Sequence, residues 1–435
     1  MCKKVYQFRD PIHGFIEVSD DELKIINSAP FQRLRNIHQL ATTYLVYHGA
    51  EHTRFGHSLG VMHLASRAFD SVTRKKNNLF SDDFTENENK TKWYRQILRL
   101  IGLTHDLGHA PFSHASEELF ENGKEHEDYT KIILCHTEIA DHIRFIGQRF
   151  KEDYGEAYDI TPELIWMIYA GEDVTNEQFI MPDFLFLKSF MDGELDCDKM
   201  DYLLRDAHYC GVSYGTYDLN RFISTLTAHK KNNQLQLAIE RGGIQALEEF
   251  VLARYFMFIQ VYFHKTRRYL DKALIKSLKE ILPDGKYPDN IEDYLKWDDN
   301  RVLNLISESS GTASLSFKSR KIMTCVYESK AHADKADAQN VRIIYNILKA
   351  SFGEKVLYDS VDKGAHKLAP KLLLPNDDSG KGIMIIDQKT DEVKNIMEES
   401  VVLDSIVKSI SIKRIYAEKE IAEDVKRKIK ELQGN

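Results

Sequence analysis

Helical spacing of apolar residues through the first two-thirds of the chain constrains the fold more than any other feature. Apolar side chains recur at intervals of three and four within residues 95–107, 161–170 and 244–282, which is typical of helices that bury one face. Strand-like alternation is rare in this part of the chain. The pattern predicts a mainly α-helical core, in which the polar residues 77–92 form an exposed loop between two helices.

The character of the chain changes after residues 307–319, a polar break rich in serine and glycine. Residues 382–388 (GIMIIDQ) and 409–417 (SISIKRIYA) are typical of strands, and residues 418–433 are typical of a charged terminal helix. We place a boundary between residues 290 and 320. The expected organisation is a helical core at residues 1–300 and a smaller α+β region at residues 301–435, with a regulatory or oligomerisation role.

Composition and charge indicate where the protein is located and argue against some classes of partner. The first ten residues contain no apolar signal-peptide core, and the longest nearly apolar stretch, residues 250–263, is too short to span a bilayer and predicts a buried helix. The five cysteines form no C-x-x-C pair, and their odd number argues against a disulfide framework, so we expect a cytoplasmic location and no membrane. The net charge of −8 argues against a protein that coats nucleic acid.

Histidines are concentrated in one part of the chain, with ten of the 17 between residues 48 and 142. The sharpest feature there is the pair His105–Asp106, which ends an apolar helical run and is followed by the helix-breaking Gly108 and Pro111. An imidazole nitrogen and a carboxylate oxygen at a helix terminus suit Mn, Fe, Zn or Ni, and with open positions also Mg. Two ligands are too few, so others are expected from His57 and from the carboxylates of residues 195–206.

Each of these features also has a simpler explanation. A His-Asp dipeptide is common in proteins that bind no metal. The acidic residues 195–206 would also suit a solvated helix face. The residues alone leave both alternatives open, and the clustering of histidines is what favours a metal site.

Three runs of residues together match the pattern of one protein family: 52–61 (HTRFGHSLGV), 105–114 (HDLGHAPFSH) and 196–202 (DCDKMDY). Residues 10–14 (DPIHG), 31–40 (FQRLRNIHQL) and 262–265 (YFHK) fit the same pattern. The chain thereby resembles the HD-domain superfamily and, within it, the deoxynucleoside triphosphate triphosphohydrolases. The resemblance implies a mainly helical catalytic core and a reaction of a dNTP with water that gives a deoxynucleoside and inorganic triphosphate.

The resemblance also implies roles for individual residues. The implied ligands of a divalent metal ion (Mg, Mn, Fe, Zn or Ni) are His57, His105, Asp106 and Asp198. The implied acid-base groups are His109, Glu117 and His126. The implied substrate-binding residues, around the triphosphate and the sugar, are Gln39, Leu40, Arg54, His114, Lys199, Tyr202, Asp206, Arg254, Tyr262, His264 and Lys265.

The chemistry suits these residue types. A metal ion polarises a phosphate oxygen and activates water, imidazoles exchange protons near neutral pH, and cations neutralise a triphosphate. A helical spacing of four, four and three would place one set of side chains on a single face: Arg254, Phe258, Tyr262 and Lys265. The simpler alternatives are a core-facing stripe for this set and an exposed loop histidine for His126.

Two positions depart from the family pattern. Gly56 stands where the family often has glutamate, and we expect a change in the support of the neighbouring His57 without loss of the metal. Asn27 stands where regulated members use an aspartate to read guanine at an effector site, while Arg35 is kept. A nucleotide effector site at Asn27 and Arg35 is therefore expected with an open base preference, together with a homo-oligomer, a dimer or a tetramer.

Two other functions compete with this interpretation. One is an HD-domain hydrolase that acts on a nucleotide monophosphate, a cyclic dinucleotide or an alarmone. The basic segment around Arg254 and Tyr262 argues against it, since a monophosphate needs fewer cations. The other is a non-catalytic nucleotide-sensing module, against which the complete set of candidate ligands and acid-base groups argues. The sequence specifies neither the preferred dNTP nor the native metal.

Overall fold

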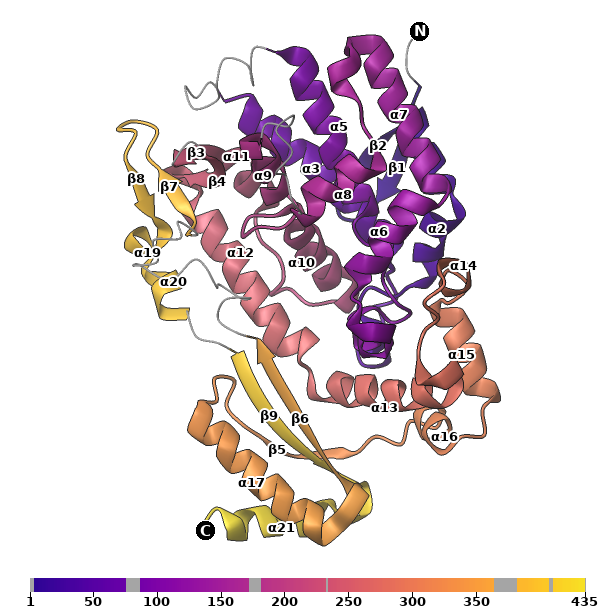
Figure 1. The fold of residues 1–435 in the computed structure, drawn as a ribbon. Coiled ribbons are helices and arrows are strands. Elements are labelled where there is room, and N and C mark those ends of the chain that lie inside the picture. Colours follow the sequence, from indigo (N-terminus) through magenta and orange to yellow (C-terminus); the bar gives the residue numbers. More distant parts are fainter. Residues whose placement is uncertain are drawn as a thin grey trace.

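The computed structural model describes residues 4–75, 87–171, 181–231, 234–363, 382–406 and 410–434. Helices dominate, and three small sheets accompany them: one near the N-terminus, one beside the helical core and one in the C-terminal region (Figure 1). The expected mainly α fold is confirmed. Within the described ranges, no helix is both long and apolar enough to cross a membrane.

The helices of the core lie between Asp20 and Lys318. In chain order they are α1 (Asp20–Asn27), α2 (Ala29–Gln32), α3 (Arg54–Thr73), α5 (Glu88–Thr104), α6 (His126–His136), α7 (Glu138–Tyr154), α8 (Pro162–Ala170), α9 (Met181–Ser189), α10 (Cys197–Cys210), α11 (Leu219–Thr225), α12 (Ile244–Met257), α13 (Lys265–Ile281), α14 (Ile291–Tyr294), α15 (Asp299–Glu308) and α16 (Thr312–Lys318).

The strands and the C-terminal helices complete the fold. They are β1 (Val5–Asp10), β2 (Gly14–Ser19), β3 (Leu226–Lys231), β4 (Gln234–Glu240), β5 (Thr324–Glu328), α17 (Lys335–Phe352), β6 (Val356–Lys363), β7 (Met384–Ile386), β8 (Val393–Asn395), α19 (Ile396–Glu399), α20 (Val401–Ile406), β9 (Ile410–Ala417) and α21 (Ala422–Leu432).

Close packing of α3 against α5 positions the site. A Cβ on Gly102 would lie 2.9 Å from the backbone nitrogen of Met62, so only glycine allows the two helix backbones to approach this closely. α10 packs against the same helix α3. His57 in the first turn of α3, His105 after the end of α5 and Asp198 in the first turn of α10 are thereby brought together.

One helix predicted as continuous is interrupted. The periodicity predicted a helix over residues 244–282, but α12 ends at Met257, a π-helical turn covers Phe258–Tyr262, and α13 starts at Lys265. The extra residue of a π turn shifts the spacing of side chains, which hydrophobic spacing alone does not reveal. The prediction that Arg254, Phe258, Tyr262 and Lys265 lie on one face of a regular α-helix is therefore wrong.

Two predicted loops are also partly wrong. α5 begins at Glu88, where the Asn87 side chain caps the helix, so residues 88–92 are helical. The remainder of that predicted loop, residues 77–86, lies outside the described residues. The Ser- and Gly-rich break at 307–319 contains the helix α16, in which Ser314 and Phe317 are buried and Leu315 is exposed, so its apolar residues do not mark its buried face.

The C-terminal region contains the two predicted strands and the predicted terminal helix, as β7, β9 and α21. β9 lies between β5 and β6 in an antiparallel sheet, and α17 and α21 pack against this sheet. β7 instead pairs in parallel with β4, in a sheet of order β3-β4-β7-β8. The two parts of the chain thus share a sheet, and the division at residue 300 stays a prediction.

Candidate metal centre and active site

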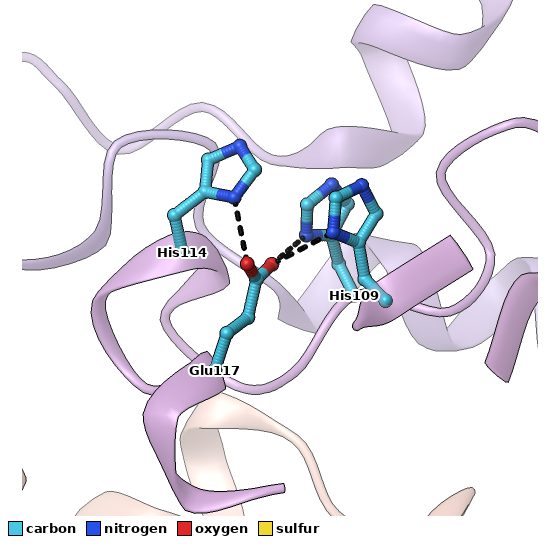
Figure 2. A group of neighbouring side chains, drawn as sticks. His109, His114 and Glu117 are labelled. Carbon is cyan, nitrogen blue, oxygen red and sulfur yellow. Dashed lines mark hydrogen bonds and ion pairs between the residues drawn. The ribbon is translucent and has the colours of Figure 1, made fainter. Parts of the chain in front are cut away.

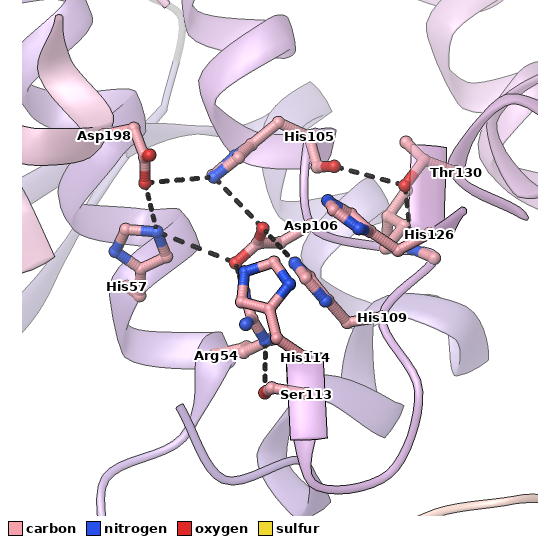
Figure 3. Close-up of polar contacts among 12 residues, drawn as sticks. Arg54, His57, His105, Asp106, His109, Ser113, His114, His126, Thr130 and Asp198 are labelled. Carbon is pink, nitrogen blue, oxygen red and sulfur yellow. Dashed lines mark hydrogen bonds and ion pairs between the residues drawn. The ribbon is translucent and has the colours of Figure 1, made fainter. Parts of the chain in front are cut away.

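Four side chains from three helices converge at the centre of the helical core. The Nε2 atom of His57 lies 3.0 Å from Oδ1 of Asp198 and 3.6 Å from Oδ2 of Asp106, and Nε2 of His105 lies 3.3 Å from Oδ1 of Asp106 (Figure 3). We call these four residues the metal-ligand cluster. Ligand atoms of His57, His105 and Asp106 lie within 4.8 Å of one another, close enough to hold one ion.

The histidines of this cluster are fixed in the tautomer that a metal ligand needs. Nδ1 of His105 donates to the carbonyl of Gly102 over 2.9 Å, and Nδ1 of His57 donates to Asp201 over 2.8 Å. Both Nε2 atoms therefore face the cluster, where loss of any proton they carry leaves a lone pair for a metal ion. Nε2 of His105 is buried and has no hydrogen-bond partner among the described residues. A cation at this place would satisfy it, so these residues fit a divalent metal ion.

The support behind His57 is a buried ion network. Asp201 accepts from Nε and Nη2 of Arg205 and lies 2.6 Å from Nε2 of His13. Arg205 also donates to Asp10 over 2.9 Å, so the N-terminal hairpin is tied to the metal-ligand cluster. A Cβ at Gly60 would lie 1.8 Å from the Asp201 carboxylate.

Gly56 has a related role. A Cβ at this position would lie 3.2 Å from Nη1 of Arg205, so the guanidinium occupies the space into which a longer side chain at residue 56 would extend. This contact gives a physical reason for the departure from glutamate noted above. Support for His57 comes here from Arg205 through Asp201.

Neighbouring charges shift the pKa values of residues in the metal-ligand cluster. Burial by itself would raise the pKa of Asp106, but the cation of Arg54 and the neighbouring His105 hold it well below its ordinary value. Burial would likewise lower the pKa of His57, but hydrogen bonds to Asp198 and Asp201 raise it to about 10. The carboxylates of Asp106 and Asp198 thus stay ionised, as metal ligands must be, and the guanidinium of Arg54 interacts directly with Asp106.

A second cluster adjoins the first. His109, His114 and His126 surround the carboxylate of Glu117, with their Nδ1 atoms 2.9 Å, 2.9 Å and 3.1 Å from its oxygens (Figure 2). We call these four residues the Glu117 cluster. The rings of His109 and His126 stack with centroids 3.8 Å apart. His109 joins the two clusters, because its Nε2 lies 3.2 Å from Oδ1 of Asp106.

The Glu117 carboxylate controls the protonation of its neighbours. Burial alone would raise its pKa, but hydrogen bonds from His109, His114 and His126 lower that pKa far below its ordinary value. Burial alone would lower the pKa of His126, and the contact with Glu117 raises it above 6.5. The contact with Glu117 thus shifts His126 toward the imidazolium, the form that can donate a proton.

Several predicted substrate-binding residues lie around a buried polar network beside α10. Oδ2 of Asp206 accepts from the Tyr262 hydroxyl over 2.7 Å, and Oδ1 of Asp206 lies 2.7 Å from Nε2 of His52. The rings of Tyr202 and Tyr262 lie 6.2 Å apart. Lys199 donates to the carbonyl of Gly193 over 2.9 Å and pairs with Asp196.

The other predicted substrate-binding residues differ in how deeply they are buried. Leu40 is buried, Gln39 has a buried Oε1 without a hydrogen-bond partner in the described part of the chain, and Arg254 lies over the ring of Phe258. Lys265, by contrast, is exposed at the start of α13, and Tyr416 of the C-terminal sheet donates to its carbonyl.

His264 and the two predicted effector residues lie away from the metal-ligand contacts. The ring of His264 packs edge-on against Tyr47, 5.8 Å between centroids. Asn27 and Arg35 are both exposed. Arg35 donates to Gln32 over 2.8 Å and covers the ring of Phe55. An effector site at these residues stays a prediction.

Sequence reasoning missed the supporting residues of the site. Asp201 follows Asp198 by three residues, and this spacing on one helix face was an available signal for a second carboxylate beside the metal ligands. His13 lies in the DPIHG run, which was noted without a role. Arg33, Tyr294 and Asp299 also contact the site's backbone, and no short-range pattern links them to it.

Comparison with known proteins agrees with this geometry. The HD-domain family model matches residues 54–159, and the model of an HD-associated region matches residues 217–344. A Bacillus subtilis protein named YwfO, of uncharacterised function, is 34% identical over 315 residues, which cover 68% of this chain and 64% of that protein. The deoxynucleoside triphosphate triphosphohydrolase SAMHD1 homolog of Dictyostelium discoideum is 31% identical over 321 residues, covering 72% of this chain and 57% of that protein.

A solved structure extends the likeness to nearly the whole chain. The crystal structure of a hypothetical protein from Aquifex aeolicus superposes with a TM-score of 0.75 at 29% identity, covering 98% of this chain and 100% of that one. The matched part of this chain spans only about two-thirds or less of the two curated relatives named above. The chain belongs to the HD-domain family and is similar to proteins named as deoxynucleoside triphosphate triphosphohydrolases.

Proposed function

We propose that this protein hydrolyses deoxynucleoside triphosphates to a deoxynucleoside and inorganic triphosphate, with a divalent ion held by His57, His105, Asp106 and Asp198. One observation carries the proposal. The metal-ligand cluster adjoins an acid-base group, the Glu117 cluster, and His109 links the two through Asp106. The similarity to proteins named as dNTP triphosphohydrolases supports the choice of substrate.

The ion and the protein have separate tasks in this proposal. A bound divalent ion would polarise an α-phosphate oxygen and lower the pKa of a bound water. Arg54, which is buried, and Lys199, which is partly buried, are cations that would hold phosphate oxygens once the substrate competes for their present carboxylate partners, Asp106 and Asp196. Ser113, which accepts from Nε of Arg54 over 2.8 Å, keeps that guanidinium oriented.

Proton transfer is assigned to the Glu117 cluster. The water oxygen forms a new bond to the α-phosphorus and releases a proton to bulk water, while the bond from that phosphorus to the 5′-oxygen breaks. His126 donates a proton to the leaving 5′-oxygen, since Glu117 favours its protonated form. Glu117 orients both His126 and His109, and the exposed His114 gives the cluster a contact with solvent.

The proposal also covers the oligomeric state and the regulation of the protein. The protein acts as a cytoplasmic dimer or tetramer that takes a nucleotide effector at Asn27 and Arg35. Exposure of both side chains leaves them accessible to such a ligand. Sedimentation with and without dNTPs tests the assembly, and a monomer under both conditions would refute it.

The central test is a product analysis. Protein loaded separately with Mg, Mn, Fe, Zn or Ni is incubated with each dNTP, with ribonucleotides, with nucleoside monophosphates and with a cyclic dinucleotide. We expect deoxynucleoside and triphosphate in equal amounts from dNTPs, and none after metal removal by chelation. Release of inorganic phosphate instead, or cleavage of the cyclic dinucleotide alone, would assign the protein to another type of HD-domain hydrolysis.

A further inference from the structure

The backbone that carries the Glu117 cluster is irregular and largely buried. Residues 107–119, which we call the active-site loop, connect the end of α5 to Phe120, and residues 107–113 are all buried. Buried N–H and C=O groups outside regular structure need partners. Several of those partners come from one stretch distant in sequence, residues 287–299, which we call the clamp segment.

The clamp segment and Arg33 together hold the loop carbonyls of Gly108 and His109. The Tyr294 hydroxyl donates to the carbonyl of Gly108 over 2.7 Å. The carbonyl of His109 accepts from Nη2 of Arg33 over 3.0 Å, and Nε of Arg33 donates to the carbonyl of Trp297 over 2.8 Å. The Arg33 guanidinium also lies 4.9 Å above the Tyr294 ring. Arg33 is thus a bridge between the loop and the clamp segment.

Asp299 holds the next part of the loop. Its Oδ1 accepts from the backbone N–H of Phe112 over 2.7 Å, and its Oδ2 accepts from the backbone N–H of His38 over 2.9 Å. Phe112 and Ser113 have φ of +60° and +53°, a left-handed conformation that side-chain-bearing residues adopt only where the surroundings hold them. Ser113 in turn donates to the carbonyl of His38 and accepts from Arg54.

We infer that Tyr294 and Asp299 are positioning residues, which act through the loop backbone to hold His109, His114 and Glu117 in their mutual geometry. They give the HD-associated region, residues 217–344, a direct part in shaping the active site. The catalytic consequence of this inference rests on the proposed function. The mechanical consequence, an ordered loop, does not.

The test uses two variants and two matched controls in the full-length protein. Tyr294→Phe removes only the hydroxyl that contacts Gly108, and Tyr269→Phe removes a partly buried hydroxyl that likewise donates to a backbone carbonyl, that of Lys321. Asp299→Asn is paired with Asp298→Asn, which alters the neighbouring carboxylate that caps α15. The measurements are kcat, KM, metal content, and amide hydrogen exchange of peptides from the active-site loop.

For the two clamp variants we expect kcat to fall about ten- to a hundredfold, since small displacements of catalytic groups have effects of this size. KM and metal content should stay near wild type, and exchange in the active-site loop should become faster. Both controls should match wild type in kcat and in loop exchange.

Wild-type kcat in the clamp variants, or equal loss in their controls, would overturn the inference. Unchanged exchange of the loop would overturn it as well. If the wild-type protein cleaves no dNTP, the proposed function fails separately, and loop exchange alone decides whether the clamp segment orders the loop.

Discussion

The metal-ligand cluster and the Glu117 cluster contain similar groups but are built differently. Both histidines of the first are buried on or beside long helices, and a fixed acceptor holds each Nδ1. The second lies on an irregular loop and at the start of α6, and its His114 side chain is 67% exposed. The difference follows from the chemistry: a metal ligand needs one tautomer and a rigid position, whereas a proton donor must exchange protons with water.

The largest expected effect is the loss of both metal and activity when a metal ligand is removed. Asp106→Ala should remove both the bound metal and all activity above background, because it deletes the anionic ligand that contacts both histidines. Metal analysis after dialysis and turnover of dNTPs are the measurements. Asp141→Ala, at a side chain 82% exposed, is the control and should behave as wild type. Retained metal in Asp106→Ala would remove this carboxylate from the ligand set.

The second effect is a loss of turnover without a loss of metal, which we expect when a residue of the Glu117 cluster is replaced. His126→Ala should keep the metal and lower kcat by about 10²–10⁴-fold, the usual contribution of a general acid. Because Glu117 raises the pKa of His126, its acid form is present below 6.5 and is lost as pH rises through the raised value. The wild-type rate should therefore decline on the alkaline side.

A comparison within the Glu117 cluster sharpens this expectation. His114→Ala, at the exposed histidine, should lower kcat less than His126→Ala does, because solvent can replace an exposed imidazole. Turnover of His126→Ala at the wild-type rate would reduce His126 to a structural neighbour of His109.

The next prediction concerns selectivity for deoxyribose over ribose, which we assign to residues around the buried network beside α10. A 2′-hydroxyl packed against apolar side chains such as Leu40 would lose water without gaining a partner, which costs roughly 1–3 kcal/mol, or about 5- to 150-fold in kcat/KM. The measurement compares dGTP with GTP in wild type, Leu40→Ala and Tyr262→Ala. Equal efficiency on both sugars in wild type would contradict the deoxynucleotide assignment.

A further effect concerns the support of His57 by Asp201. Asp201→Asn should weaken metal affinity by about 10–100-fold, as the loss of a carboxylate behind a metal-binding histidine typically does. Glu22→Gln is the matched control, because it breaks another buried carboxylate–arginine pair, with Arg99, outside the metal-ligand cluster. Both variants should lose thermal stability, and only Asp201→Asn should lose affinity for the metal. Equal affinities would make Asp201 purely structural.

A glycine offers an independent way to disturb the same support. Gly60→Ala would place a Cβ 1.8 Å from the Asp201 carboxylate, which Arg205 and His13 hold on its other sides. We expect a loss of metal affinity at least as large as in Asp201→Asn. Normal affinity would show that the carboxylate can shift without releasing His57.

Local sequence determined the helices with strong periodicity and the terminal strands, because these elements depend on residues a few positions apart. The family pattern also supplied the candidate ligands, and the structure places His57, His105, Asp106 and Asp198 side by side. It could not reveal the π turn at Phe258–Tyr262, since backbone hydrogen bonding and packing, not composition, set its extra residue.

Only the tertiary structure decided how the two clusters are held. Asp201 meets His13 across 188 positions, and Asp299 meets Phe112 across 187. Such contacts leave no local trace, because they form only when distant helices pack and bring buried polar groups to their partners. The sequence by itself thus determined which side chains could do the chemistry, and long-range packing determined their tautomers, their burial and their orientation.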